Sequence, residues 1–173
     1  MDTVNVNVLA ISPVSFIADD TTNCAPLCVQ FTNTTPNTVA CDWDFGDNTT
    51  SNICNPFYCY NNPGSYSVTL IITDINGCKD TLSKINYLNV YPNAIASFTM
   101  QPTATTLQYP DINFIDLSTN ASTWLWNFGD GSIFSTAQNP VHTYSDTGTF
   151  CIQLIASNIN LCNDTAIGCL NIY

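Results

Sequence analysis

The chain has 173 residues and a formal net charge of −11, because 13 acidic residues, all of them aspartates, are set against only Lys79 and Lys84. This charge disfavours nucleic acid as a partner, since phosphate binding requires Lys and Arg that displace counterions. Glu and Arg, which favour helices, are absent, while Thr, Val, Ile and aromatic residues that fit strands are plentiful. We therefore expect an all-β chain with essentially no helix, and no apolar stretch approaches the roughly 20 residues of a membrane span.

Residues 1–11 come first and resemble the last strand of a preceding structural repeat. The stretch 2–8 alternates valine with polar residues, and its Asp2-Thr3 pair returns at Asp80-Thr81. Neither a basic segment nor an apolar run follows Met1, so a secretory signal is not predicted here. We expect a piece of a longer array, in which this strand completes a sheet edge of a neighbouring repeat or subunit.

The rest of the chain is an internal repeat, with one copy in residues 12–91 and another in residues 92–173. Trp43-Asp44-Phe45-Gly46-Asp47 returns 83 residues later as Trp126-Asn127-Phe128-Gly129-Asp130. The copies also match at their ends, where residues 88–91 correspond to residues 170–173. Because about 80 residues can bury one modest core, each copy is predicted to be one domain.

Short strands are predicted within each copy. Residues 66–72 alternate between two faces with period two, and residues 150–156 repeat the pattern. Asn-Pro, Pro-Gly and Asn-Gly pairs mark turns between such segments. This spacing favours an antiparallel β-sandwich in each copy.

The repeated pentapeptide has a structural interpretation. Its two aromatic residues share one strand face and should fill the core, while its Gly permits a tight turn and its Asp accepts backbone N–H groups there. A tyrosine four residues before a Gly in each copy should bury its ring and direct its hydroxyl at backbone. The residues given these roles are Trp43, Phe45, Gly46, Asp47 and Tyr60, and in the second copy Trp126, Phe128, Gly129, Asp130 and Tyr144.

Together these motifs resemble the PKD (polycystic kidney disease) domain family. The W-x-F-G-D motif is followed by Asn139-Pro140-Val141-His142-Thr143-Tyr144, by Gly148, and in the first copy by a strand ending near Asn76-Gly77-Cys78. The resemblance covers residues 12–173 and implies two tandem immunoglobulin-like sandwiches of an extracellular or cell-surface protein. The segment 24–27 together with 76–78 is similar to copies in large secreted proteins of Bacteroidota bacteria. In the first copy Tyr58 replaces the family's usual His, and Asn48 stands where Gly often follows the Asp.

Nine cysteines, a single histidine and no C-x-x-C metal spacing indicate an oxidising, extracellular environment. Three disulfides are expected from strand geometry. Cys41 and Cys54 fall opposite each other around the Gly46-Asp47 turn, and Cys151 falls opposite Cys169 in a hairpin centred near Asn160. The third pair forms if two further cysteines lie outward on neighbouring strands, namely Cys28 and Cys59.

Cys24, Cys78 and Cys162 are then left over. We expect a bridge between Cys24 and Cys78, which leaves Cys162 free or bonded to another chain or module. In an alternative, the loop carrying Cys162 faces the preceding copy and Cys162 bridges Cys24 across the junction. A further alternative is that several of the nine cysteines are buried free thiols.

A calcium site and a hydrolytic site are the two kinds of chemistry that the sequence could support. Asp42, Asp44 and Asp47 could converge with the pair Asp19-Asp20, and calcium prefers carboxylate oxygens. However, no EF-hand spacing is present, and outward aspartates on a strand commonly stay solvated, so no cofactor is expected. His142 should pack and hydrogen-bond, and no Ser or Cys nucleophile lies at a recognisable spacing from it, so the chain is not predicted to be an enzyme.

Glycans are a further possibility for modification. Asp-Thr followed by a small or apolar residue resembles the O-glycosylation acceptor of Bacteroidota, although a Thr-rich chain also produces it by chance. The acceptors would be Thr3, Thr21, Thr81 and Thr165. N-glycosylation sequons, which matter only in an N-glycosylating host, occur at Asn33, Asn48, Asn120 and Asn163.

The sequence therefore favours a non-catalytic extracellular structural and interaction module, a tandem repeat of a cell-surface adhesin or filament. Its expected partners are neighbouring repeats or subunits of the same array, with surface glycans or proteins as a further class. The alternative is a substrate- or polysaccharide-binding accessory module of a secreted hydrolase. In that case exposed aromatic side chains would bind the ligand, and the candidates are Tyr58, Tyr87, Tyr109 and Trp124. The same four residues could instead pack in the core or between strands.

Overall fold

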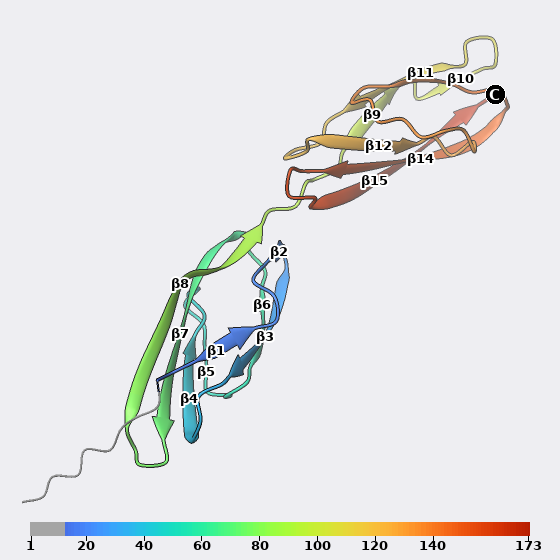
Figure 1. The fold of residues 1–173 in the computed structure, drawn as a ribbon. Coiled ribbons are helices and arrows are strands. Elements are labelled where there is room, and N and C mark those ends of the chain that lie inside the picture. The colour runs from blue at the N-terminus through green and yellow to red at the C-terminus, as the bar shows by residue number, and fades with distance from the viewer. Residues whose placement is uncertain (1–12) are drawn as a thin grey trace, which may run out of the picture. The chain divides into compact units, whose positions relative to one another are not determined.

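The computed structural model describes residues 13–173, and the chain separates into two compact units, Met1–Tyr91 and Pro92–Tyr173 (Figure 1). Regular secondary structure within the described residues consists of strands alone, so the prediction of an all-β fold is confirmed. The strand expected in residues 1–11 lies outside the described residues, and so does Thr3.

The first unit contains a three-stranded sheet of order β1-β3-β6 and a five-stranded sheet of order β2-β8-β7-β4-β5. Neighbouring strands are antiparallel except for β2, which runs parallel to the end of β8. The strands are β1 (Phe16–Ala18), β2 (Thr22–Cys24), β3 (Leu27–Asn33), β4 (Thr38–Asp44), β5 (Thr50–Ser51), β6 (Phe57–Tyr60), β7 (Gly64–Asp74) and β8 (Lys79–Tyr91).

The second unit repeats this plan with a four-stranded sheet of order β10-β15-β14-β12 and a three-stranded sheet of order β13-β11-β9. Its short β10 runs parallel to the end of β15, as β2 does to β8. The strands are β9 (Phe98–Gln101), β10 (Ala104–Thr105), β11 (Asp111–Asp116), β12 (Thr123–Asn127), β13 (Val141–Thr143), β14 (Gly148–Ser157) and β15 (Asn163–Ile172).

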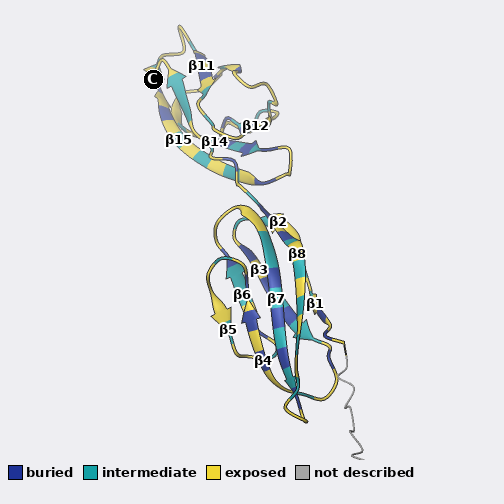
Figure 2. Ribbon diagram, turned by 90° about the vertical axis from the view of Figure 1, so that its left-hand side faces the viewer, coloured by how far each residue is buried: buried dark blue, intermediate teal, exposed yellow. Residues whose placement is uncertain are grey.

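Each unit has its own hydrophobic core, formed by the inward residues of alternating strands. Figure 2 shows buried residues at intervals along β7, where Val68, Leu70 and Ile72 are almost fully buried. In the second unit Ile152 and Leu154 of β14 are buried in the same way. Complete burial of one such side chain stabilises the fold by about 1.5–3 kcal/mol. Because the apolar residues alternate with period two, they all lie on one face of each sheet, and that face is the one buried in the core.

Three disulfides lie within the units, in the pairs expected from the sequence. One joins β3 to β6, one joins β4 to the segment after β5, and one joins β14 to β15. The pairs are Cys28–Cys59, Cys41–Cys54 and Cys151–Cys169. Cys151 and Cys169 are directly opposed in the β14–β15 hairpin, as hairpin geometry predicted, and Cys28 and Cys59 are directly opposed on the neighbouring strands β3 and β6.

The expected bridge between Cys24 and Cys78 is wrong, because Cys78 carries a free thiol. Cys162, expected to be free or bonded to another chain or module, is disulfide-bonded, as is Cys24. The reason is distance: Cys24 lies opposite Tyr91 at the end of β8, whereas Cys78 directly precedes the start of that strand. A strand of 13 residues spans roughly 40 Å, far beyond the reach of a disulfide. The alternative bridge between Cys24 and Cys162 stays a prediction.

Candidate functional site

The turn of the repeated motif has the same glycine geometry in the two copies. Gly129 has φ +79°, and a Cβ added there would lie 2.5 Å from the carbonyl oxygen of Cys151 in β14. Gly46 has φ +81°, and its added Cβ would lie 2.3 Å from the carbonyl oxygen of Ser67 in β7. Only glycine fits at either position, because both the backbone conformation and the close approach of a strand exclude a side chain.

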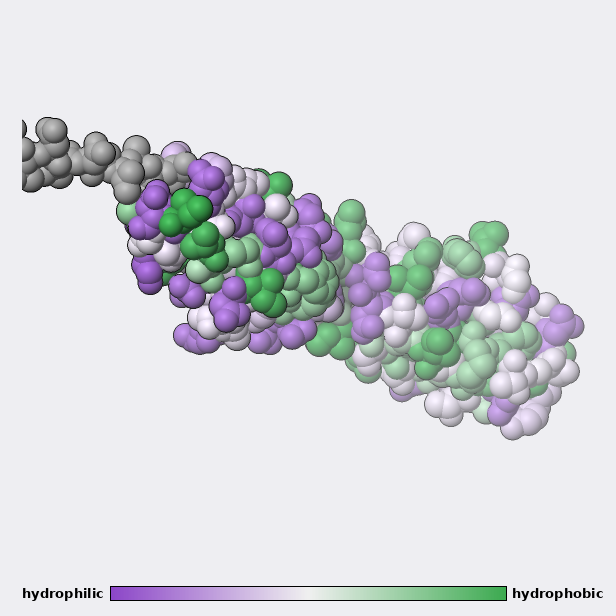
Figure 3. Space-filling view, turned by 90° about the horizontal axis from the view of Figure 1, so that it is seen from below, coloured by the Kyte–Doolittle hydropathy of each residue, from purple (hydrophilic) through white to green (hydrophobic). Residues whose placement is uncertain are grey.

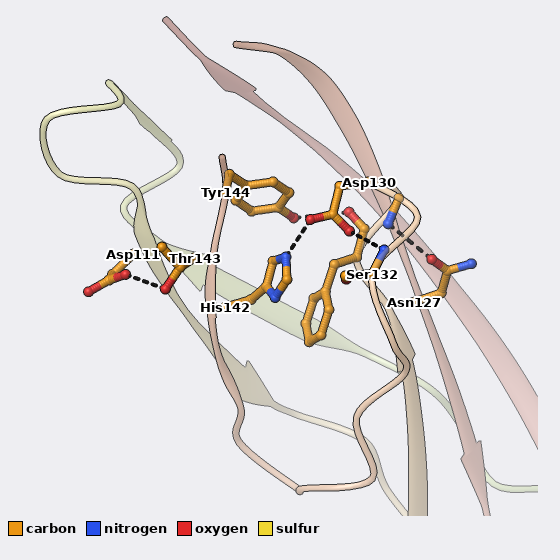
Figure 4. Close-up of polar contacts among 9 residues, drawn as sticks. Asp111, Asn127, Asp130, Ser132, His142, Thr143 and Tyr144 are labelled. Carbon is orange, nitrogen blue, oxygen red and sulfur yellow. Dashed lines mark hydrogen bonds and ion pairs between the residues drawn. The ribbon is translucent and has the colours of Figure 1, made fainter. Parts of the chain in front are cut away.

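Asp130 holds the second-unit turn together (Figure 4). One carboxylate oxygen accepts a hydrogen bond from the backbone N–H of Ser132 at 3.0 Å. The other lies 2.6 Å from Nε2 of His142, which donates because an ionised carboxylate can only accept. Burial acts to raise the pKa of Asp130, but the hydrogen bonds from Ser132 and His142 outweigh it and hold the pKa below its usual value.

The ring of His142 is held by packing as well as by this hydrogen bond. It stacks on Phe128 with ring centroids 4.0 Å apart and planes 5° apart. Tyr144 meets the imidazole edge-on, with ring centroids 4.7 Å apart. Because one nitrogen bonds to Asp130 and the ring packs between Phe128 and Tyr144, His142 acts as part of the turn, in agreement with the packing role expected from the sequence.

Tyr58 takes the position of this histidine in the first unit. Its ring stacks on Phe45 with centroids 4.1 Å apart and planes 5° apart, and its hydroxyl donates to Asp47 at 2.7 Å. The other oxygen of Asp47 accepts the backbone N–H of Thr49 at 3.1 Å. Burial acts to raise the pKa of Asp47, but the hydrogen bonds from Thr49 and Tyr58 outweigh it and lower the pKa. A flat ring bearing one donor is thus what this position requires, and both His and Tyr supply it.

The second tyrosine of each motif secures the backbone of the motif strand. Tyr60 donates its hydroxyl to the carbonyl oxygen of Phe45 at 3.0 Å, and Tyr144 donates to that of Phe128 at the same distance. Both tyrosines are about 1 % exposed, and burial raises the pKa of each phenol above its usual value. These hydroxyls therefore remain protonated donors, in the role predicted from the sequence.

The motif tryptophans fill the centre of each core and differ in one contact. Trp43 meets the ring of Phe16 edge-on at 5.0 Å, and Trp126 meets Phe98 in the same way at 5.2 Å. The indole N–H of Trp126 donates to the carbonyl oxygen of Ala137 at 2.9 Å. Within the described residues the buried indole N–H of Trp43 has no partner. The first core therefore leaves one donor unsatisfied, which costs free energy.

The aspartates considered for calcium are used locally and do not converge. Asp44 accepts the backbone N–H of Gly46 at 2.8 Å, Asp19 that of Gln30 at 2.9 Å, and Asp20 that of Thr22 at 3.1 Å, while Asp42 is exposed on β4. Hydrogen bonds from Thr22 and Asn23 hold the pKa of Asp20 below its usual value. Across residues 13–173 no group of three His, Cys, Asp or Glu side chains is placed to hold a metal ion.

The candidate glycan acceptors lie at different levels of exposure. Thr81 on β8 and Thr165 on β15 are exposed and occupy equivalent positions, opposite Ile71 and Ile155 of the preceding strands. Thr21 is half-buried. Modification of these hydroxyls stays a prediction, with Thr81 and Thr165 the most accessible acceptors.

Among the four candidate binding aromatics only Tyr109 is well exposed, at 71 %. Trp124, Tyr58 and Tyr87 are half-buried and pack against the cores. The hydroxyl of Tyr87 also accepts the backbone N–H of Ala18 at 3.0 Å, so this residue serves the fold. On the face shown in Figure 3, apolar side chains form small groups separated by polar ones.

An open depression of about 600 Å³ lies on the outer side of β4, β5 and β7. Its lining combines the carboxylates of Asp42 and Asp44 with the hydroxyls of Thr50 and Thr69, beside the apolar side chain of Ile71. Such a surface offers hydrogen-bond acceptors and donors to a neutral polar ligand.

Among the described residues no helix has the length and apolarity needed to cross a membrane.

Comparison with known proteins gives the same domain twice. A family model described as the PKD domain matches residues 11–90 and again residues 89–167. The chain is 42% identical over 65 residues to the pre-pro-metalloprotease PrtV of Vibrio cholerae, an alignment that covers 36% of this chain and 7% of that protein. It is 28% identical over 128 residues to polycystin-1-like protein 1 of Oryzias latipes, covering 68% of this chain and 4% of that protein. The chain thus spans only a small part of these relatives.

Similar solved structures include single domains of the same kind. The PKD1 domain of the Vibrio cholerae metalloprotease PrtV is 32% identical, and the match covers 46% of this chain and 99% of that chain with a TM-score of 0.39. The PKD1 domain of Vibrio anguillarum Epp is 15% identical, and the match covers 46% of this chain and 93% of that chain with a TM-score of 0.41.

Proposed function

The chain belongs to the PKD domain family, and on this basis we propose that it is a non-catalytic extracellular structural and interaction module. The observation that carries the proposal is that the polar side chains of the repeated motif already form hydrogen bonds within their own domain. Asp47 and Asp130 bond to their own turns, and the hydroxyls of Tyr60 and Tyr144 bond to backbone. Groups engaged in this way stabilise the domain and are not free to bind or transform a substrate.

Location outside the cell is supported by the cysteines. The three disulfides within the units would be reduced in a typical cytosol and persist in oxidising compartments. Each disulfide contributes about 2–4 kcal/mol by restricting the unfolded chain. In units of about 80 residues, whose cores are modest, such contributions help to maintain the fold outside the cell.

The finer form of the proposal is a tandem repeat of a cell-surface adhesin or filament, with neighbouring repeats or subunits as partners. Tandem duplication supports it, because repetition of one domain multiplies length and surface without adding a new site. The exposed, equivalent threonines Thr81 and Thr165 are consistent with a glycosylated surface in such an array.

The second candidate function is a polysaccharide- or substrate-binding accessory module of a secreted hydrolase. Two observations favour it: the 71 % exposed ring of Tyr109, and the open depression lined by Asp42, Asp44 and Thr69. An exposed aromatic ring can stack on an apolar sugar face, and carboxylates can accept hydrogen bonds from sugar hydroxyls. One similar protein is named as a metalloprotease, which places this domain family beside a hydrolase in that protein.

A retention assay separates the two functions. The full chain is incubated with insoluble polysaccharides and with fibrous proteins, and the fraction left in the supernatant is measured. A structural module should stay in the supernatant with every material. Saturable retention that is lost in Tyr109→Ala or in Asp42→Asn would contradict the structural proposal and support the accessory one. Tyr173→Ala, which removes another exposed tyrosine ring, is the matched control.

A further inference from the structure

Each copy of the fold has an incoming end, where the chain begins its repeat, and the second unit shows which turn lies there. The backbone N–H of Ala94, near the start of this unit, donates to the carbonyl oxygen of Cys162 at 3.4 Å. The side-chain amide of Asn158 donates to the carbonyl oxygen of Pro92 at 2.7 Å. The β14–β15 turn, residues 158–162, therefore marks the incoming end of the copy.

The outgoing end is marked by the short parallel strand of each copy. Cys24 in β2 lies opposite Tyr91, the last residue of the first unit, and the next residue donates its backbone N–H to the carbonyl oxygen of Tyr91 at 2.9 Å. In the second unit Leu107 donates to Tyr173 at 3.2 Å in the same way. Thr106 is consequently the counterpart of Cys24, and it is exposed.

Cys78 is the counterpart of Cys162, with the same local hydrogen bonds. Asp74 accepts the backbone N–H of Cys78 with its side chain at 2.8 Å, and its own N–H donates to the carbonyl oxygen of Cys78 at 2.9 Å. Asn158 makes the two corresponding bonds to Cys162 at 3.1 and 3.0 Å. The two cysteines thus occupy one position of the fold, at the incoming end of each copy.

Their chemical states differ. Cys162 and the outgoing cysteine Cys24 are disulfide-bonded, whereas Cys78 is free among the cysteines of the described residues. We propose that Cys78 is a docking cysteine, which forms a disulfide with the outgoing cysteine, at the position of Cys24, of another copy of this fold. This proposal rests on the proposed structural function and names its partner, another copy of the fold. A disulfide between copies would fix successive modules to one another.

The bond forms by thiol–disulfide exchange with a small disulfide such as oxidised glutathione. The thiolate of Cys78 attacks one sulfur of the small disulfide, forms a mixed disulfide and releases one thiolate. The outgoing thiolate of the other copy then attacks the sulfur of Cys78 and displaces the second small thiol. Two protein thiols are oxidised and one small disulfide is reduced to two thiols, so electrons and protons balance.

Thr106→Cys tests this proposal, because it supplies the second copy with an outgoing cysteine while Cys78 remains free. In a glutathione redox buffer this variant should form a ladder of disulfide-linked multimers on a non-reducing gel. Peptide mapping should join the peptide containing Cys78 to the one containing position 106. Thr136→Cys, which introduces a cysteine at an exposed threonine away from the outgoing end, is the matched control.

The expected rate of multimer formation is at least tenfold higher for Thr106→Cys than for Thr136→Cys. Adding Cys78→Ser to the first variant should limit its products to dimers. Equal rates for the two introduced cysteines would overturn the proposal, since Cys78 would then show no preference for a cysteine at the outgoing end. That outcome would leave the structural function untouched, because the retention assay tests the function without reference to Cys78.

Discussion

Replacement of Gly129 by alanine tests the explanation of the repeated motif in one substitution. Gly129 and Gly131 lie in the same turn with almost the same backbone, φ +79° and φ +80°. A Cβ at Gly129 would meet the carbonyl oxygen of Cys151 at 2.5 Å, whereas a Cβ at Gly131 has nothing within 4 Å. Gly131→Ala is therefore a control that reproduces the backbone strain without the collision.

The magnitudes follow from these two contributions. A left-handed backbone costs an alanine about 1–2 kcal/mol, and both variants incur this cost. The collision adds about 1–3 kcal/mol for Gly129→Ala, the range for overpacking a well-filled site. Cys151 cannot move away freely, because it is paired in β14 and disulfide-bonded to Cys169. We expect losses of about 2–5 kcal/mol for Gly129→Ala and about 1–2 kcal/mol for Gly131→Ala.

Differential scanning calorimetry measures the difference, with the unsubstituted first unit as the reference transition. For a domain of this size 1 kcal/mol lowers the melting temperature by about 4–8 °C, so the two variants should differ by at least about 4 °C. Equal melting temperatures for Gly129→Ala and Gly131→Ala would refute the reasoning. The glycine of the motif would then be required only for its backbone conformation and not for the approach of β14.

Three further predictions concern the residues around this turn. Tyr144→Phe removes a buried hydroxyl bond to Phe128 and should cost about 1–2 kcal/mol in urea unfolding, and an unchanged midpoint would contradict the assigned role. His142→Tyr should lower the melting temperature far less than His142→Ala, because Tyr58 makes the same stack and hydrogen bond in the first unit, and equal losses would argue against this equivalence. Asp130 has a lowered folded-state pKa, so its stabilisation is fully present above the unfolded value of about 3.9 and is lost as pH falls through the lower folded value. Melting temperatures measured between about pH 5 and pH 2 should therefore fall less in Asp130→Asn than in the unsubstituted chain, and parallel curves would exclude a contribution from Asp130.

Much of the fold could be predicted because its signals are local or repeated. Alternation in residues 66–72 indicated a strand, and opposed positions in a hairpin identified the pairing of Cys151 with Cys169. The packing role of Trp43 and Trp126 followed from their place on one strand face, and both are buried. Each inference needed only the period of a strand and the geometry of one turn.

The errors arose where the structure depends on contacts that leave no periodic signal. The three-residue β2 pairs in parallel with the far end of β8, and this pairing separates Cys24 from Cys78. The local bonds of the aspartates also leave no periodic signal, as with Asp44, which accepts the backbone N–H of Gly46. A visible clue was the spacing itself, since an Asp two residues before its N–H donor is typical of an Asx turn.

Lys84 was also missed as a structural residue. Its ammonium group donates to the carbonyl oxygen of Phe16 at 2.7 Å and lies 4.6 and 4.3 Å from the ring centroids of Phe16 and Tyr87. Phe16 and Lys84 are 68 residues apart, so no local pattern connects them. A basic residue in so acidic a chain was the one available hint of a specific contact.

The central claim, a disulfide-stabilised module that functions outside the cell, is tested most directly by the redox state of its cysteines. Protein isolated from its native source is alkylated without reduction, and its intact mass gives the number of free thiols. The structure has disulfides at Cys28–Cys59, Cys41–Cys54 and Cys151–Cys169, bonded Cys24 and Cys162, and a free Cys78. We predict at most one alkylated cysteine per chain, at Cys78. Folded protein with all nine cysteines alkylated would contradict the claim.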